Sequence, residues 1–372
     1  MTDSYASKLW KVIPGLLLMF FIAALSMGTK DLGLPQWIGL EGVLKANSDF
    51  LGKVLKINYV ILVIVIGMVI RNTIGIPSWA LDGVKTSRLF IKMGVILLGT
   101  LYSLAELATL GATSVVLILA FVFGTIIFTM WFGKKMNMPT SSAACLAAGV
   151  GVCGVSAIVA VAPAVRGKGE DIAYSIATIL SFGLVCMFTF PFLGHLMGLS
   201  SEQFGAWAGT GILNSGQVLA AALAFDPGTV DNPSISLKVG EVFNLTRVIF
   251  LPLVVMVIAL LYTRMCNESE NQEAAATTGS FMSKFPLFVL GFLATVTLTS
   301  FGAFGSIDPA SAELKMFRLL YGWFFAIGLT GLGLQISFAE MKKAGGKPLI
   351  VGSAAGLLKA VGSLIVVLLL ID

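Results

Sequence analysis

Charged residues are scarce in this chain: Asp, Glu, Lys and Arg make up 12% of its 372 residues, whereas hydrophobic residues make up 57%. Soluble domains carry about 25% charged residues, so the composition excludes a large soluble domain and predicts a chain that crosses a membrane several times. The 24 Lys and Arg exceed the 19 Asp and Glu by a net charge of +5, but no basic run is interleaved with aromatic residues. A nucleic-acid partner is therefore not expected.

Groups that perform catalysis or bind metals are equally scarce. The chain has one histidine and no HExxH motif, and Asp226, Asp231 and Asp308 fall in predicted loops instead of forming an intramembrane pair. Its cysteines lack the spacing of a metal site or of a secreted disulfide framework, and they are expected to behave as small buried hydrophobic residues. We expect neither an enzyme nor a bound cofactor. The four cysteines are Cys145, Cys153, Cys186 and Cys266.

Long apolar runs are what the sequence has in abundance. A membrane-crossing helix needs about 20 apolar residues, and about eleven such runs predict an all-α polytopic membrane protein with a single transmembrane domain over 1–372. The stretch 32–56 carries scattered charges and is expected at the membrane interface, and 267–280 is a polar connecting segment. The predicted crossings lie near 10–28, 57–76, 87–108, 112–132, 140–163, 171–197, 203–224, 239–263, 284–306, 314–338 and 348–371.

Lysine and arginine are distributed unevenly between the two sets of loops. The first apolar run resembles a signal peptide, but it is as apolar as many later runs and is interpreted as a retained first helix. The positive-inside rule then places the amino terminus in the cytoplasm and the carboxyl terminus on the other side. Basic residues on the predicted cytoplasmic side include Lys8, Lys11, Arg71, Lys85, Arg88, Lys134, Lys135, Arg264, Lys342, Lys343 and Lys347.

An internal repeat is visible. The segment 94–111, "GVILLGTLYSLAELATLG", aligns without gaps on 328–345, "GLTGLGLQISFAEMKKAG", at an offset of 234 residues. The matches include Gly94 with Gly328 and Ser103 with Ser337. Each copy is predicted to end one helix and begin the next, and the two copies run in opposite directions across the membrane. Inverted repeats of this kind are typical of secondary transporters.

Glycines interrupt the apolar run 140–163. Gly149, Gly151 and Gly154 lie in mid-span and Ser156 follows them, in the sequence "GVGVCGVSAIVAVAPAV". If the helix is broken there, the second half-helix presents an N-terminus with free N–H groups and a partial positive charge of roughly +0.5, which suits an anion. The alternative is that small residues only allow close helix packing.

A second polar interruption lies in "GTGILNSGQVLAAALAFDPG", 209–228, where Asn214, Ser215 and Gln217 occupy three of four positions. Such groups are costly in a membrane unless they bond to each other, to water or to a substrate. The alternative is hydrogen bonding between helices. Two interrupted segments in one chain favour a transporter binding site.

Four ionisable residues lie in or near apolar runs. Arg247 lies within its span, and its guanidinium suits an oxyanion, although it could instead pair with Glu241 or extend to the interface. Lys359 lies near the middle of the last span without an evident partner. His195 is predicted to be interfacial and without a ligand role.

The runs "LAAGVGVCGVSAIVAVAPAV", "GEDIAYSIATILSFGLVCMFTFPFLG" and "GTGILNSGQVLAAA" resemble a bacterial inner-membrane family named for sulfate export. The segments "IGMVIRNT", "LTRVIFLP" and "GLGLQISFAEMKKAGGKPL" are similar to its other signatures, and the resemblance covers roughly 55–370. That family is grouped with the bile-acid-symporter and cation/proton-antiporter clan, so the resemblance implies two discontinuous helices, an elevator-type fold and a bacterial inner-membrane location. It also implies a homodimer.

The chain departs from the family pattern where the coupling ion is concerned. Many members carry a histidine followed by an acid where Leu213 and Asn214 stand, and a lysine where Asn244 stands. Proton coupling through that pair therefore does not transfer. Asn214-Ser215-Gly216 is instead similar to the asparagine-serine element of sodium-dependent bile-acid carriers, which leaves Na⁺ and H⁺ both open.

These observations predict a secondary carrier that moves a small anion, either sulfate- or sulfonate-like or a carboxylate, by alternating access, in either direction. The alternatives are a sodium- or proton-coupled organic-anion carrier of the bile-acid-symporter type, and an anion channel or sensor. The part that moves is predicted to lie in 112–264, and the scaffold in 57–108 and 284–338. The predicted substrate-binding residues are Gly151, Cys153, Gly154, Val155, Ser156, Asn214, Ser215, Gln217 and Arg247, and the predicted ion-coupling residues are Asn214, Ser215 and Glu241.

Overall fold

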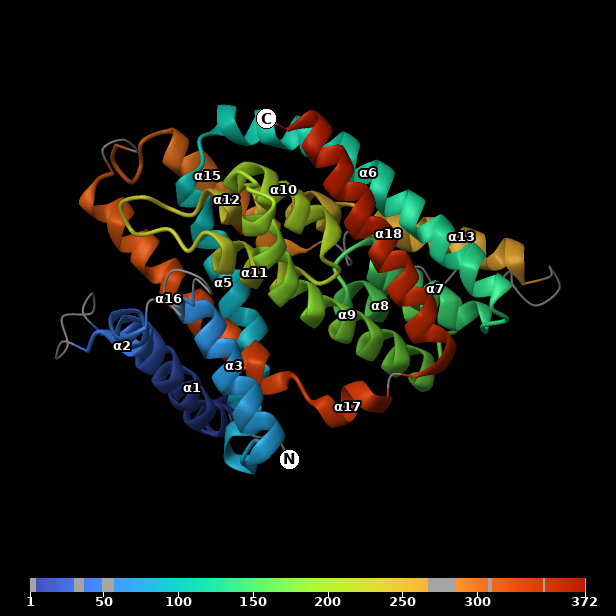
Figure 1. Cartoon of the computed structure of the whole chain (residues 1–372), viewed down its shortest axis with the longest axis horizontal. Helices are drawn as coiled ribbons and strands as arrows, with labels where there is room; N and C mark the ends of the chain where they lie inside the picture. The colour runs from blue at the N-terminus through green and yellow to red at the C-terminus, as the bar shows by residue number, and fades with distance from the viewer. Residues whose placement is uncertain are drawn as a thin grey trace. The chain divides into compact units, whose positions relative to one another are not determined.

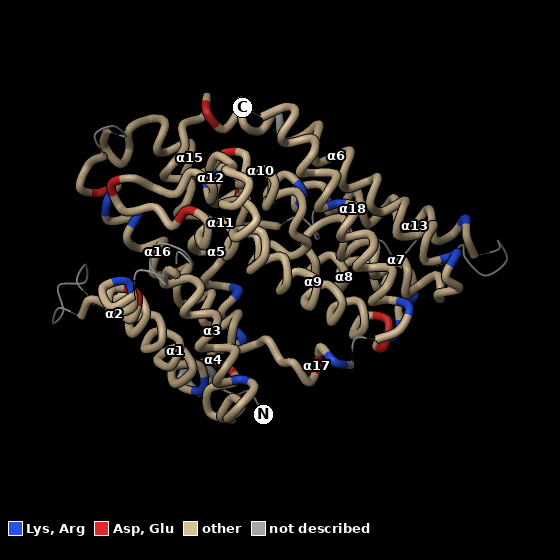
Figure 2. The backbone as a smooth tube through the Cα atoms, viewed as in Figure 1, with Lys and Arg blue, Asp and Glu red and all other residues tan. Residues whose placement is uncertain are grey.

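The computed structural model describes residues 5–29, 37–48, 57–266, 286–306, 310–343 and 345–371. Within these ranges the regular structure is helical, with no strand (Figure 1). Charged residues gather mainly at helix ends and in connecting segments, and most of the chain between them is uncharged (Figure 2). The chain is therefore an all-helical membrane protein, as its composition predicts. The segment 267–280 lies outside the described residues.

Five described helices are long and apolar enough to cross a membrane, and a sixth candidate is a pair bent by 48°. The bent pair joins α12 to α13, and Pro252 stands in the first turn of α13, where it lacks the N–H that would continue the preceding helix. The predicted count of about eleven crossings stays a prediction. The five are α1 (Tyr5–Met27), α6 (Leu104–Lys135), α9 (Gly169–Leu196), α16 (Ala312–Gln335) and α18 (Gly346–Leu370), and the pair is α12 (Ile235–Ile249) with α13 (Leu251–Met265).

The remaining described helices are shorter, and they correct one predicted boundary. The runs 87–108 and 112–132 were expected to be separate crossings, but the first helix ends at Leu98 and one continuous helix begins at Leu104. Gly111 lies inside that helix, although glycine is a poor helix former. The shorter helices are α2 (Gly39–Asn47), α3 (Tyr59–Thr73), α4 (Leu81–Lys85), α5 (Ser87–Leu98), α7 (Thr140–Gly151), α8 (Val155–Val161), α10 (Ser201–Gly211), α11 (Ser215–Phe225), α15 (Leu287–Ser300) and α17 (Phe338–Lys343).

The helices group into two compact units. Unit 1 comprises 1–104, 226–234 and 290–338, and unit 2 comprises 105–225, 235–289 and 339–372. Each unit is described by itself below.

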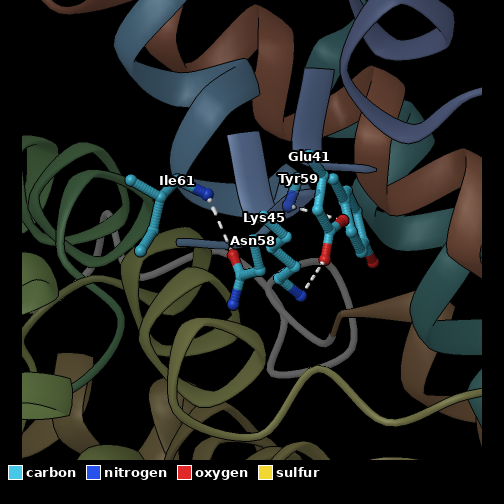
Figure 3. A network of polar contacts seen from close by, with 5 residues as sticks. All are labelled: Glu41, Lys45, Asn58, Tyr59 and Ile61. Carbon is cyan, nitrogen blue, oxygen red and sulfur yellow. Dashed lines mark hydrogen bonds and ion pairs between the residues drawn. The ribbon is translucent and has the colours of Figure 1, made fainter. Parts of the chain in front are cut away.

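In unit 1, α2 is fastened to the start of α3 (Figure 3). The Glu41 carboxylate accepts the Tyr59 N–H at 3.0 Å and pairs with Lys45 at 2.6 Å, while the Asn58 side chain accepts the Ile61 N–H at 3.2 Å. Both acceptors satisfy N–H groups that the first turn of a helix leaves open. Part of the predicted interfacial stretch, α2, is therefore tied to a helix of unit 1.

The segment 226–234, which connects α11 to α12 in the chain, belongs to unit 1. Arg318 of α16 donates to the Val230 carbonyl at 3.1 Å, and Lys315 pairs with Asp231 at 2.8 Å. The hydrogen bond from Lys315 lowers the pKa of the exposed Asp231 carboxyl. This loop is therefore held by the first two turns of α16.

The two copies of the repeat, α5 and α16, pack against each other reciprocally. A side chain at Gly94 would collide with the ring of Phe325, and a side chain at Gly328 would collide with Ile91. Phe325 and Gly328 are the repeat equivalents of Ile91 and Gly94, so each copy makes the same contact on the other. Gly94 follows Ile91 in α5, but its partner Phe325 precedes Gly328 in α16. The two helices therefore run antiparallel, as an inverted repeat requires.

The ends of the two copies are also equivalent. The Tyr102 N–H bonds to the Gly99 carbonyl at 3.3 Å, and at the matching position the Ile336 N–H bonds to the Gly333 carbonyl at 3.1 Å. The next helices then begin at matching residues, Leu104 and Phe338. Their N–H groups are accepted by side chains at the ends of two other helices: Ser300 of α15 for Leu104, at 2.8 Å, and Asn72 of α3 for Phe338, at 2.7 Å.

We expect Asn72→Ala to loosen the start of α17. Asn72 also donates to the Ile336 carbonyl at 2.9 Å and, within α3, to the Met68 carbonyl at 2.8 Å. The substitution therefore removes both hydrogen bonds that hold the start of α17, each worth about 1 kcal/mol net. Amide hydrogen exchange at Phe338 should accelerate several-fold. Thr73→Val is the control because Thr73 bonds only within its own helix, to the Val69 carbonyl. Unchanged exchange at Phe338 in Asn72→Ala would contradict the cap.

Unit 2 contains both interrupted segments. Its core is rich in alanine and glycine, which lets helices approach closely: a side chain at Gly205 or Gly209 of α10 would collide with the α12 backbone. The end of α18 lies against the start of α10, because the Gln203 side chain donates to the Ile371 carbonyl at 2.8 Å.

Candidate functional site

The first interruption lies between α7 and α8. Helix α7 ends at Gly151, and Gly154 has φ +77° and ψ −119°, a conformation that side chains strongly disfavour. The Gly154 N–H bonds back to the Gly149 carbonyl at 3.2 Å, and the chain then re-enters a helix at Val155. The break predicted from the glycines is present, and Gly154 is the residue that requires the special conformation.

The second interruption lies between α10 and α11. Helix α10 ends at Gly211, Ile212 is extended, and α11 begins at Ser215. The Asn214 side-chain oxygen accepts a hydrogen bond from the Gly216 N–H at 3.0 Å. The backbone carbonyl of Asn214 accepts from the N–H groups of Gln217 and Val218, both at 3.0 Å. Asn214 therefore caps the N-terminus of the second half-helix.

The two interruptions meet. A Cβ atom added to Gly154 would lie 2.9 Å from the Asn214 amide nitrogen, closer than side chains pack. Position 154 therefore requires glycine, both for its backbone conformation and because Asn214 lies so close. The breaks of two segments about 60 residues apart in the chain therefore meet within unit 2. This meeting point of the α7–α8 break and the α10–α11 break is called the crossing below.

Each half-helix that ends at the crossing is capped by a buried cation from another helix. Lys359 of α18 donates to the carbonyls of Val150 and Gly151 at 2.8 and 3.0 Å. Arg247 of α12 donates to the Ile212 carbonyl at 2.7 Å. These are carbonyls that a helix C-terminus leaves without partners, and they carry partial negative charge. The exposed fractions of the two side chains are 1% for Lys359 and 0% for Arg247.

A chain of side-chain hydrogen bonds links Arg247 to the second break. The Asn244 carbonyl oxygen accepts from Arg247 at 2.9 Å and from Ser215 at 2.8 Å, while its amide group donates to Glu241 at 3.1 Å. Both donors require the oxygen of Asn244 to face them, which fixes the orientation of its amide. Glu241 and Arg247 are therefore connected through Asn244 and form no direct ion pair.

The accessible part of the crossing is the beginning of the second half-helices. Ser156 is exposed, and Asn214, Ser215 and Gly216 are half-buried. Cys153 is 5% exposed, and its thiol donates to the Ser156 hydroxyl at 3.4 Å. The helix C-termini are thus occupied by cations, whereas small polar groups beside the N-termini remain open.

The other predicted residues lie elsewhere. Gln217 is fully buried and donates to the Leu180 carbonyl of α9 at 3.1 Å, and Val155 is buried. Gly151 contributes to the crossing only its backbone carbonyl, which accepts from Lys359. His195 stacks on the ring of Phe225 with centroids 4.2 Å apart, at the end of α9. None of the four cysteines forms a disulfide bond, and the described residues contain no cluster of three or more His, Cys, Asp or Glu that could hold a metal ion.

Sequence reasoning missed how Asn244 and Lys359 take part. Asn244 had been noted only as a departure from a family pattern, and Lys359 had no partner within reach in the sequence. The detectable signal was a lysine in the middle of an apolar run in a chain with broken helices, whose ends offer buried carbonyls. The partner itself lies about 208 residues away in the chain.

Comparisons with known proteins agree on the family. The model of the family described as conserved hypothetical protein 698 matches residues 14–352, so the chain belongs to that family. A UPF0324 membrane protein of Nitratidesulfovibrio vulgaris is 44% identical over 370 residues, covering 98% of this chain and 96% of that protein. UPF0324 membrane protein Atu0671 of Agrobacterium fabrum is 29% identical over 312 residues, with 83% of each chain covered. A Bacillus cereus relative is 27% identical over 327 residues, covering 87% and 91%. All three are named as membrane proteins, and none of the names states a substrate.

Proposed function

We propose that the protein is a secondary carrier of a small anion, with its binding site where the two interrupted helices cross. The observation that carries the proposal is the asymmetry of the crossing: the helix C-termini are neutralised by Lys359 and Arg247, while polar groups at the N-termini of the second half-helices are accessible. Broken helices that cross in the interior are the usual binding site of transporters with inverted repeats.

Electrostatics favours an anion at this site. Two buried basic side chains, Arg247 and Lys359, lie at the crossing, and the N-terminus of α11 adds partial positive charge on the accessible side. Ser156 supplies a hydroxyl donor to an oxyanion, whereas the Ser215 hydroxyl already donates to Asn244. We propose a sulfur-containing oxyanion, a sulfonate or a small carboxylate as the substrate class, in keeping with the resemblance to the sulfate exporter family.

The repeat supports alternating access. The reciprocal contacts of α5 and α16 lie within unit 1, and the crossing lies wholly in unit 2. We propose that unit 2 carries the substrate while unit 1 serves as the scaffold, in a bacterial inner membrane, with the amino terminus in the cytoplasm and the carboxyl terminus in the periplasm. A homodimer is part of the same proposal.

The test begins with thermal shift of the purified protein against sulfate, sulfite, thiosulfate, taurine and small carboxylates. Anions that stabilise the protein are then followed as labelled probes in proteoliposomes. Saturable uptake that is accelerated by unlabelled anion on the opposite side identifies a carrier and separates it from a channel or a sensor. Stabilisation by cations or neutral solutes alone would contradict the anion site.

Ser156→Leu should abolish transport without lowering stability. Because Ser156 is exposed at the crossing, a leucine there fills the accessible space but removes no packing, so the melting temperature should stay within about 2 °C. Labelled-anion uptake in proteoliposomes measures the effect. Val159→Leu, one turn further along α8 at a side chain that is 55% exposed, adds bulk away from the crossing and should transport normally. Wild-type uptake by Ser156→Leu would remove the proposed site.

A further inference from the structure

We propose that the carrier is coupled to protons and that Glu241 is the residue that binds the coupled proton. The inference rests on the proposed carrier function and specifies its driving ion. It stands on the geometry of α12, where a buried carboxyl lies two hydrogen bonds from the second helix break.

Glu241 is a buried acid with little to stabilise its charge. Its side chain is 1% exposed, accepts one hydrogen bond from the Asn244 amide at 3.1 Å, and forms no ion pair with any described residue. The guanidinium of Arg247, six residues further along α12, donates to Asn244 and Ile212 instead. A buried carboxylate without a direct cation is expensive, and taking up a proton removes that cost. Ionisable groups in this setting commonly carry protons across membranes.

A sodium ion fits the same residues poorly. Cations bound through oxygen need several free oxygen ligands, but the Asn214 side-chain oxygen accepts the Gly216 N–H and the Asn244 oxygen accepts two hydrogen bonds. The Ser215 hydroxyl is the donor of one of them. The adjacent guanidinium would also repel a cation. A proton needs none of these oxygens except those of Glu241.

Asn244 connects the protonation state of Glu241 to the break between α10 and α11. Its amide donates to Glu241, and its oxygen holds both Ser215, the first residue of α11, and Arg247, which caps Ile212 at the end of α10. A hydrogen bond to a carboxylate is roughly twice as strong as one to a neutral acid. Loss or gain of the proton therefore changes how firmly Asn244 is held, and with it the two half-helix ends.

Few other titratable groups face this carboxyl. Helix α10 presents Gly205 and Gly209 to α12 and has its acid, Glu202, in the first turn, while α11 has no titratable residue. On α13 the charged residue is Arg264, in the last turn. The remaining groups are Arg247, with Cys153 and Lys359 as its electrostatic neighbours, and Lys238 of α12, which pairs with Glu106 of α6.

Infrared difference spectroscopy on the full-length purified protein tests the proton site directly. Between mildly acidic and mildly alkaline buffers, the wild type should show the C=O stretch of a neutral carboxylic acid appear and disappear. Glu241→Gln should remove this band, and Glu241→Asp should keep it at a shifted position. The matched control is Glu106→Gln, an acid that is 45% exposed and paired with Lys238, which should leave the band unchanged. A band that survives in Glu241→Gln overturns the proposal.

Transport in proteoliposomes tests the coupling. With labelled thiosulfate as the probe and no sodium present, a pH gradient should accelerate uptake by the wild type at least several-fold and have no effect on Glu241→Gln. Acceleration by a sodium gradient at equal pH, with no response to the pH gradient, would overturn the proposal. If no anion is transported but the infrared band depends on Glu241, the carrier function fails while the proton site stands.

Discussion

Arg247→Met should abolish transport and lower the stability of unit 2. The guanidinium holds the Ile212 carbonyl at 2.7 Å and the Asn244 oxygen at 2.9 Å, in a site where its exposed fraction is 0%. Methionine fills a similar volume but donates nothing, so one carbonyl at a helix end loses its partner, at about 1–3 kcal/mol. It also removes one of the two buried cations at the crossing. We expect uptake to fall by at least 100-fold and the melting temperature by several degrees.

Two variants separate the role of the side chain from general damage. Arg247→Lys keeps the charge but cannot reach both acceptors in the fork geometry of a guanidinium, so it should recover part of the stability and little of the transport. Arg264→Met removes an exposed arginine from the last turn of α13 and should behave as the wild type. Thermal melting and labelled-anion uptake measure both effects. Wild-type uptake by Arg247→Met would show that this cation takes no part in the site.

Much of the helical layout follows from the lengths of the apolar runs. The runs 171–197 and 348–371 correspond to α9 and α18 within about two residues, because a membrane-spanning helix must be about 20 residues long. The boundary between α5 and α6 was misplaced because side-chain acceptors from distant helices, such as Ser300, set it. The bend between α12 and α13 was missed although Pro252 was its signal.

The two helix breaks of the candidate site could be predicted from the sequence, but the side chains that cap the helix ends there could not. Gly154 and Asn214 carry local signals, since glycine marks unusual backbone conformations and asparagine marks helix N-termini. That Gly154 meets Asn214, and that Lys359 meets Gly151, depends on contacts between segments far apart in the chain. No pattern within one segment contains that information.

Gly154→Ala should disable the crossing through the addition of one methyl group. An alanine at φ +77° and ψ −119° costs about 1–3 kcal/mol in backbone strain. Its Cβ would also lie 2.9 Å from the Asn214 amide nitrogen and 3.1 Å from Ile179. If the Asn214 side chain moves away from the new methyl group, it loses the hydrogen bond that it accepts from the Gly216 N–H, and the start of α11 is destabilised. We expect transport to fall at least tenfold and the melting temperature to drop by several degrees.

The matched control is Gly124→Ala on α6, in the same unit, where no atom lies within 4 Å of the added methyl group. Alanine is favoured over glycine in a helix by about 1 kcal/mol, so this variant should melt at the same temperature as the wild type or slightly higher. A second comparison is Gly154→Ala combined with Asn214→Ala, which removes the collision but keeps the backbone strain. Asn214→Ala alone also removes the cap of α11, so the comparison is with the sum of the two single variants. If Gly154 and Asn214 touch, the double variant should lose less stability than that sum and should still fail to transport. Equal stability of Gly154→Ala and Gly124→Ala would mean that the two interruptions do not touch in the protein.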